Sequence, residues 1–353
     1  MTEPTTEHVI FEIDGSVARI RLNRPRAIHA LDTAMCLAIS ARLAEWRADP
    51  AIELVTIDHA DGRGFCAGGD IRAAAASGAG DGVDARAFFH AEYRMNHQLF
   101  TYAKPVVAFM DGVTMGGGVG LARPAKYRIA TERTVFAMPE AAIGLFPDVG
   151  AGWYLSRLPG ELGKYLVLTG ARLDGAECLG LGLATHYMPS DALEGVKRAL
   201  VDAPREIDRI LHDASIPAPP AGIDARRKAI ARLFAADTLE DILAALTAEP
   251  SDWATEQHAL VASRSPTTCK VALRQLADAA LLTDFADEMR MEYGIAWHIV
   301  QRPDFAEGVR AVIVDKDNRP RWDPATPEGV TEHMIDRIFA PLPPGEEWTP
   351  LPG

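Results

Sequence analysis

The chain has 353 residues, of which 48% are hydrophobic, and this is enough apolar material for one large domain or two smaller ones. Its 36 basic and 49 acidic residues give a formal net charge of −13, which argues against a general nucleic-acid surface and against docking on anionic membranes. We therefore expect neither nucleic acid nor a membrane as a partner.

Four cysteines are scattered along the chain without a Cys-x-x-Cys pair or a nearby histidine pair: Cys36, Cys66, Cys178 and Cys269. This spacing predicts neither a zinc site nor a disulfide framework, so no metal is expected and a reducing compartment fits best. The first seven residues show no targeting pattern, and no run reaches membrane-spanning length. We expect a cytoplasmic protein.

The chain begins with a predicted β-hairpin. Residues 9–13 and 17–22 alternate between apolar and polar side chains, with an Asp14-Gly15 turn between them. A helix is predicted from Asp32 to the region of Pro50. A strand at 54–57, a glycine-rich turn at 64–70 and an Ala- and Gly-rich linker at 73–82 follow.

The order of strand, turn and helix then repeats. The next predicted elements are a helix at 85–103, a strand at 106–110, a glycine turn at 115–121 leading into a helix, and strands at 127–130 and 135–138. Repeated strand-strand-helix units of this kind indicate an α/β domain.

From Asp191 onward the pattern changes to amphipathic helical segments separated by proline-rich breaks. Ser265-Pro266 is a typical N-cap and first-turn pair for a helix that continues through Leu276. We therefore predict a catalytic core at residues 1–200 and a mostly helical region at residues 205–353.

Two acids stand out in the apolar, glycine-punctuated stretch at residues 138–150. Glu140 and Asp148 lie eight residues apart. Buried carboxylates are costly unless they are paired, hydrogen-bonded or used in chemistry, so the pattern suggests a functional site. Each acid also follows a proline, however, and an ordinary helix start explains that arrangement equally well.

The two glycine turns each place unobstructed backbone N–H groups at a strand-to-helix junction, which is typical of an oxyanion hole. A tight turn requiring positive φ explains one or two of these glycines, but less easily the three consecutive ones at 116–118. A dinucleotide-binding loop does not fit, because its third glycine position holds Leu121.

Glu92 lies within the predicted helix at 85–103, where Phe88, Met95, Leu99 and Tyr102 form an apolar stripe around it. A face made of Phe89, Tyr93 and Phe100 would instead leave Glu92 nearer solvent, and periodicity leaves both options open. There is no Gly-x-Ser-x-Gly or His-Glu-x-x-His string, which argues against serine-type and zinc hydrolysis.

Together, residues 65–71, 115–121 and 138–150 resemble the enoyl-CoA hydratase/isomerase (crotonase) superfamily. The resemblance implies a crotonase-like spiral of repeated strand-strand-helix units followed by a mostly helical C-terminal region. It covers nearly the whole chain, through further motifs at 23–25, 157–158, 168–170, 265–267, 273–276, 307–313 and 315–317.

The resemblance also implies roles for individual residues. The amides of Gly69 and Gly117 would hold the thioester oxygen, Glu140 would be the principal catalytic carboxylate and Asp148 its partner. Glu92 would line the acyl pocket and contact the substrate. Within the superfamily, the motifs most resemble those of a thioester hydrolase. Related hydratases carry a second catalytic glutamate at the position of Gly120, and its absence here speaks against a hydratase mechanism.

The expected activity is hydrolysis of a short-chain β-hydroxyacyl-CoA, most specifically 3-hydroxyisobutyryl-CoA in valine catabolism. No cofactor is expected, because CoA is part of the substrate. An enoyl-CoA hydratase or isomerase is the alternative, and a non-catalytic acyl-CoA-binding or RNA-binding member is a further one. Homo-oligomers are common in the superfamily, and the sequence leaves the oligomeric state open.

Local positive charge is expected near the CoA phosphates. Arg24, Arg26 and Lys316 are candidates, although each is equally explained as a solvated surface charge. His29 occupies a position where the superfamily often has Asn, and we expect it to be a surface or capping group without a catalytic role.

Overall fold

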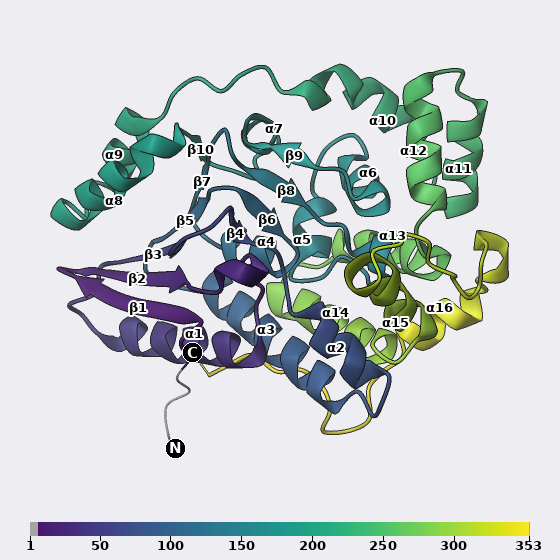
Figure 1. The fold of residues 1–353 in the computed structure, drawn as a ribbon, viewed down its shortest axis with the longest axis horizontal. Coiled ribbons are helices and arrows are strands. Elements are labelled where there is room, and N and C mark those ends of the chain that lie inside the picture. Colours follow the sequence, from purple (N-terminus) through teal and green to yellow (C-terminus); the bar gives the residue numbers. More distant parts are fainter. Residues whose placement is uncertain (1–5, 353) are drawn as a thin grey trace.

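The computed structural model describes residues 6–352. Two β-sheets lie at the centre of the molecule, and helices from both halves of the chain surround them (Figure 1). The first five residues, on which part of the prediction about targeting rests, lie outside the described residues. No helix in the described part of the chain is long and apolar enough to cross a membrane.

The larger sheet has the strand order β1-β2-β3-β5-β7-β10. β1 and β2 form the predicted antiparallel hairpin, and every later pair of neighbours is parallel. Its strands are β1 (Val9–Asp14), β2 (Val17–Leu22), β3 (Leu54–His59), β5 (Val106–Met110), β7 (Tyr127–Ala130) and β10 (His186–Tyr187).

The smaller sheet has the order β4-β6-β8-β9, in which the first three strands are parallel and the last is antiparallel. Its strands are β4 (Gly64–Cys66), β6 (Val113–Met115), β8 (Val135–Ala137) and β9 (Leu173–Asp174). Each of β3, β5 and β7 is followed along the chain by a strand of this second sheet and then by a helical segment. The predicted strand-strand-helix repeat is therefore confirmed.

The helices before residue 205 are α1 (Thr33–Ala48), α2 (Ile71–Gly78), α3 (Val83–Phe100), α4 (Gly117–Ala122), α5 (Ala151–Leu155), α6 (Leu162–Thr169), α7 (Gly175–Gly180) and α8 (Leu193–Asp202). The prediction of a linker at residues 73–82 is wrong, because most of it belongs to α2. Asp70 caps this helix by accepting from the Ala73 N–H, and alanine has the highest helix propensity.

Residues 205–352 are mostly helical and contain no strand, as predicted. Their helices are α9 (Ile207–Ala214), α10 (Arg227–Leu233), α11 (Leu239–Ala248), α12 (Asp252–Ala262), α13 (Pro266–Ala279), α14 (Phe285–Ile299), α15 (Pro303–Val309) and α16 (Glu332–Ile338). α13 begins at the predicted cap, where Ser265 Oγ accepts from the Thr268 N–H at 3.2 Å.

Short one-turn segments connect these elements: η1 (Pro25–Ala27), η2 (Glu140–Ile143), η3 (Ser190–Ala192), η4 (Gly222–Arg226), η5 (Arg310–Val314) and η6 (Pro327–Gly329). η2 begins at Glu140, whereas Asp148 precedes α5 by three residues. The interpretation of both acids as helix starts therefore holds for Glu140 and fails for Asp148.

The main hydrophobic core is shared by both halves of the chain. Phe65 and Phe146 from the α/β part lie in one buried cluster with Phe285 and Trp348 from the helical part. A second cluster lies between the larger sheet and α8 and α9 (Figure 1). The division near residue 200 stays a prediction. All four cysteines are buried and free.

Candidate active site

Both glycine turns and all three predicted acids line one cavity of about 570 Å³. The lining residues come from the loops around α2 and α4, from the 138–150 loop and from α3. Its apolar lining residues include Ile71, Phe89, Ala142, Leu145 and Ile313. The structure thus brings Gly69, Glu92, Gly117, Glu140 and Asp148 together.

The first glycine turn is held against residue 31. The Leu31 N–H donates to the Gly68 carbonyl and the Asp70 N–H donates to the Leu31 carbonyl, each at 2.7 Å. This pairing uses the groups on either side of Gly69. The Gly69 amide itself has no hydrogen-bond acceptor among the described residues.

The second turn brings another unpaired amide beside the first. Gly116 has φ 49° and ψ −123°, a backbone conformation that glycine adopts far more readily than other residues. The next amide, of Gly117, also has no acceptor in the described part of the chain. It would lie 3.6 Å from a Cβ placed on Gly68, so the two turns are in contact. Two free donors at one place suit a developing oxyanion.

Glu140 and Asp148 line the same cavity as these amides. A Cβ placed on Gly116 would lie 3.0 Å from Glu140 Oε1, while Glu140 Oε2 has no hydrogen-bond partner. Asp148 Oδ2 accepts from the Tyr93 hydroxyl at 2.8 Å. Both acids are at most 5% exposed. Glu140 is therefore a free carboxylate, and Asp148 is held by a tyrosine.

Glu92 is buried and projects from α3 toward the second turn. Its Oε1 has no partner and would lie 2.3 Å from a Cβ placed on Gly117. Phe88, Phe89, Tyr93 and Met95 are buried as well. Both candidate faces of α3 are thus largely buried, and for this reason periodicity could not decide the position of Glu92.

Burial favours the protonated forms of all three acids, and repulsion from neighbouring acids adds to this effect for Glu92 and Glu140. Burial raises the pKa of Glu92 well above its ordinary value, and the nearby Asp148 and Glu140 raise it further. Burial also raises the pKa of Glu140, with a further contribution from Asp148. For Asp148, burial raises the pKa to about 7, although the Tyr93 hydrogen bond opposes this change.

The raised pKa of Asp148 predicts that this residue makes the folded protein less stable at neutral and alkaline pH than at acidic pH. Because its folded-state pKa is raised, the folded protein binds more protons than the unfolded chain between about pH 4 and pH 7, and stability falls as pH rises through that window. Asp148→Asn keeps an acceptor for Tyr93 but cannot ionise. The stabilisation that it confers should be about 2 kcal/mol larger near pH 8.5 than near pH 5.5. Urea denaturation at both pH values measures this difference, and equal values would contradict it.

Gly120 lies in a place with no room for a side chain. A Cβ there would approach Val149 Cβ to 2.7 Å and Asn96 Nδ2 to 2.8 Å. Asn96 is fully buried one turn after Glu92, and neither of its amide atoms has a partner. The space beside Gly120 is therefore already occupied by Asn96 and Val149.

His29 is buried rather than exposed, so the expectation of a surface or capping group is wrong. Its Nδ1 accepts from the Arg24 N–H at 2.9 Å, and its Nε2 lies 2.7 Å from the Asp61 carbonyl. Burial lowers the pKa of His29, which favours a neutral ring that donates through Nε2. The ring thereby braces the loop that leads to Leu31 and the first glycine turn.

The basic candidates are placed differently from one another. Arg24 and Arg26 line the cavity, but Arg24 is paired with Asp70 at 2.7 Å. Lys316 is exposed and is not among the lining residues. Arg72, which the sequence interpretation missed, lines the cavity and bonds the Ile313 carbonyl. No helix was predicted around Arg72, because residues 73–82 were interpreted as a linker.

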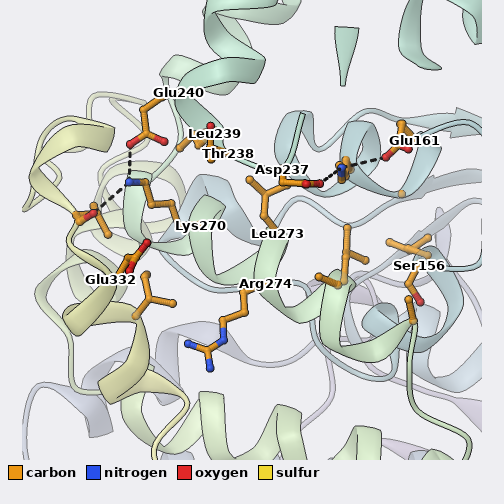
Figure 2. Close-up of a pocket in the computed structure, with 18 of the residues that line it drawn as sticks. Ser156, Glu161, Asp237, Thr238, Leu239, Glu240, Lys270, Leu273, Arg274 and Glu332 are labelled. Carbon is orange, nitrogen blue, oxygen red and sulfur yellow. Dashed lines mark hydrogen bonds and ion pairs between the residues drawn. The ribbon is translucent and has the colours of Figure 1, made fainter. Parts of the chain in front are cut away.

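A larger cavity of about 640 Å³ lies between α6, α11, α13 and α16 (Figure 2). Its basic side chains are already neutralised by acids: Lys270 by Glu240, Arg274 by Asp336, and Lys164 by Glu161 and Asp237. None of the predicted site residues lines it. The unpaired carboxylate oxygens and free amides therefore assign the candidate site to the smaller cavity.

Comparisons with known proteins agree on one family. A family model described as enoyl-CoA hydratase/isomerase matches residues 17–339. The mitochondrial 3-hydroxyisobutyryl-CoA hydrolase of Danio rerio is 40% identical over 351 residues, which is 97% of this chain and 92% of the relative. The probable 3-hydroxyisobutyryl-CoA hydrolase 2 of Arabidopsis thaliana is 38% identical over 358 residues, covering 97% and 94%.

Two solved structures share the whole fold. A carnitinyl-CoA dehydratase from Mycobacterium thermoresistibile has a TM-score of 0.93 and 39% identity, covering 98% of this chain and 99% of that one. An enoyl-CoA hydratase from Rhodobacter sphaeroides has a TM-score of 0.89 and 37% identity, covering 97% and 100%. These similar proteins are thus named as a hydrolase, a dehydratase or a hydratase of CoA compounds.

Proposed function

Since the chain belongs to the enoyl-CoA hydratase/isomerase family, we propose that it hydrolyses the thioester of a short-chain β-hydroxyacyl-CoA, specifically 3-hydroxyisobutyryl-CoA, to the free hydroxy acid and CoA. The observation that carries this proposal is that a carboxylate oxygen without a partner, Glu140 Oε2, and two free amides belong to residues that line one cavity. The names of relatives about 40% identical over most of the chain support the substrate.

In the proposed reaction, the thioester oxygen accepts hydrogen bonds from the Gly69 and Gly117 amides, which stabilise the charge that develops on it. Glu140 reacts as the carboxylate, which is the form that burial disfavours. This carboxylate either attacks the carbonyl carbon to form an anhydride, which water then cleaves, or removes a proton from an attacking water molecule. In both routes the carbon–sulfur bond breaks and CoA leaves as a thiolate.

Asp148 is suited to protonate the departing sulfur. Because its pKa is raised to about 7, a substantial fraction carries a proton at neutral pH. Glu92 projects toward Gly117, which supports a role in holding the 3-hydroxyl group of the substrate. The reaction as proposed uses side chains, backbone amides and water, without a cofactor.

The CoA phosphates require positive charge at the mouth of this cavity. Arg26 and Arg72 line it, are exposed, and have no carboxylate partner among the described residues. We include both as phosphate-binding residues in the proposal. Arg24 is less suited to this role because Asp70 already neutralises it.

An enoyl-CoA hydratase is the second candidate, and the name of the similar structure from Rhodobacter sphaeroides favours it. The resemblance places a second acid of that mechanism at position 120, which is glycine here. A side chain at this position would collide with Asn96 and Val149. This local packing supports hydrolysis over hydration.

The biological setting remains part of the proposal. Valine catabolism would follow from 3-hydroxyisobutyryl-CoA as the substrate. We also retain a cytoplasmic location, although several relatives are named mitochondrial. Assembly into a homo-oligomer stays open.

A thiol-release screen over a panel of acyl-CoAs tests the proposed function. We expect 3-hydroxyisobutyryl-CoA to be hydrolysed with the highest kcat/KM, and crotonyl-CoA and methacrylyl-CoA to lose their double-bond absorbance no faster than without enzyme. Hydration of either enoyl-CoA without free thiol would favour the hydratase instead. Tight RNA binding without turnover of any acyl-CoA would favour a non-catalytic protein.

A further inference from the structure

Polar side chains from the helical C-terminal half converge on the backbone around Asp148. Glu292 of α14 accepts from the Gly150 N–H through Oε2 at 2.8 Å, and Gln275 of α13 donates to the Pro147 carbonyl at 2.8 Å. Gln275 Nε2 also donates to Glu292 Oε1 at 3.0 Å. Gln275 is 1% exposed and Glu292 is fully buried. The residues before and after the Asp148-Val149 pair are thus clamped.

The clamped backbone is strained. Val149 has φ 56°, which is a rare conformation for a β-branched residue, and it directly follows Asp148. Such a residue persists where its surroundings fix it on several sides, and strain of this kind is concentrated at functional sites. The bonds from Gln275 and Glu292 provide that fixation.

Glu288, one turn before Glu292 on α14, extends the clamp. Its Oε1 accepts from the Trp153 N–H at 3.1 Å, so the first turn of α5 is held by two carboxyl groups. The carboxyl groups of Glu288 and Glu292 also lie within hydrogen-bonding reach of each other. Burial raises the pKa of Glu288 to about 7 and also raises that of Glu292, which favours one proton shared between them.

We propose that Glu292, Glu288 and Gln275 are positioning residues that hold the strained backbone at Val149 and thereby aim the Asp148 carboxyl group into the acyl-CoA cavity. This inference rests on the proposed hydrolase function. None of the three lines the cavity. They act through Asp148, so their loss should lower kcat more than it changes KM.

Exchanging the side chains of Glu292 and Gln275 distinguishes a positioning role from a role in packing alone. Glu292→Gln places an NH₂ group against that of Gln275, and Gln275→Glu adds a third carboxyl group beside Glu288 and Glu292. In the double variant, a protonated carboxyl group at position 275 can donate to the Pro147 carbonyl and accept from the amide at position 292. That amide still offers its oxygen to the Gly150 N–H.

We expect each single variant to lower kcat by roughly 10–100-fold, with KM changed by less than about threefold, because a small misplacement of a catalytic group has effects of this size. The double variant should recover kcat to within about fivefold of the wild type, which is a strong non-additive coupling. Steady-state thiol release from 3-hydroxyisobutyryl-CoA by the full-length protein measures all of these values.

Asp58→Asn is the matched control. Asp58 is also a buried acid, but it lies on β3, does not line the cavity and pairs with Arg19, Arg21 and Lys197. We expect this variant to melt at a lower temperature while kcat stays within about twofold, because it removes buried ion pairs without touching the clamp.

The outcomes separate the two proposals. A wild-type protein that hydrolyses no acyl-CoA defeats the proposed function. An active wild type whose single variants keep kcat, or whose double variant recovers nothing, overturns the positioning role. If a single variant fails to fold, Gln275→Met replaces it in the test, because methionine has a similar volume but cannot donate to the Pro147 carbonyl or to Glu292. An unchanged kcat in Gln275→Met also overturns the positioning role.

Discussion

Glu140→Gln is expected to lower kcat for 3-hydroxyisobutyryl-CoA by a factor on the order of 10³–10⁴. A carboxamide neither attacks a thioester nor takes a proton from water. The change keeps the size of the side chain and removes an acid that burial and Asp148 already disfavour in its charged form. The thermal midpoint should therefore stay equal or rise while activity is lost.

Thiol release and a thermal melt on the same preparation measure both effects. Glu240→Gln is the control, since Glu240 lies in the larger cavity in an ion pair with Lys270 and should not affect turnover (Figure 2). Wild-type turnover by purified Glu140→Gln would falsify the role of Glu140.

Gly117→Ala is expected to be the most damaging single-methyl change in the site. Its Cβ would lie 2.3 Å from Glu92 Oε1 and 3.2 Å from Leu31 Cδ1, so the Glu92 carboxylate or the turn must move. Moving the turn displaces an amide of the oxyanion hole, and moving Glu92 removes the contact proposed for the 3-hydroxyl group. We expect kcat/KM to fall by about 10²–10³.

Gly195→Ala is the same substitution where nothing opposes it. Gly195 lies in α8, and a Cβ there meets no atom within 4 Å. We expect this control to keep full activity and to gain about 0.5–1 kcal/mol of stability, because alanine favours helices over glycine. If both variants retained wild-type kcat/KM, the assignment of the Gly117 amide would have to be abandoned.

Elements whose signals are local were predictable from the sequence. The Asp14-Gly15 hairpin, the helix capped by Asp32 and the helix opening at Ser265-Pro266 all form as expected. In each case the turn or cap residue lies within a few positions of the element that it defines. The fold class followed from repetition of such local units.

Features that depend on distant contacts were not predictable in this way. α2 was interpreted as part of a linker because the segment is rich in Ala and Gly. His29 gave no sign that its ring would be buried and bonded to the Asp61 carbonyl. Glu288 and Glu292 reach the Asp148 loop across more than 130 residues of chain. No spacing rule connects positions so far apart in sequence.

The four buried cysteines have a practical consequence for every experiment above. Burial raises the pKa of each thiol, so none is readily ionised or reached by a colorimetric thiol reagent while the protein is folded. The background of a CoA-release assay should therefore be low. When the protein unfolds, the same reagent gains four new targets per chain, so one reagent can count product molecules from the native enzyme and also report denaturation.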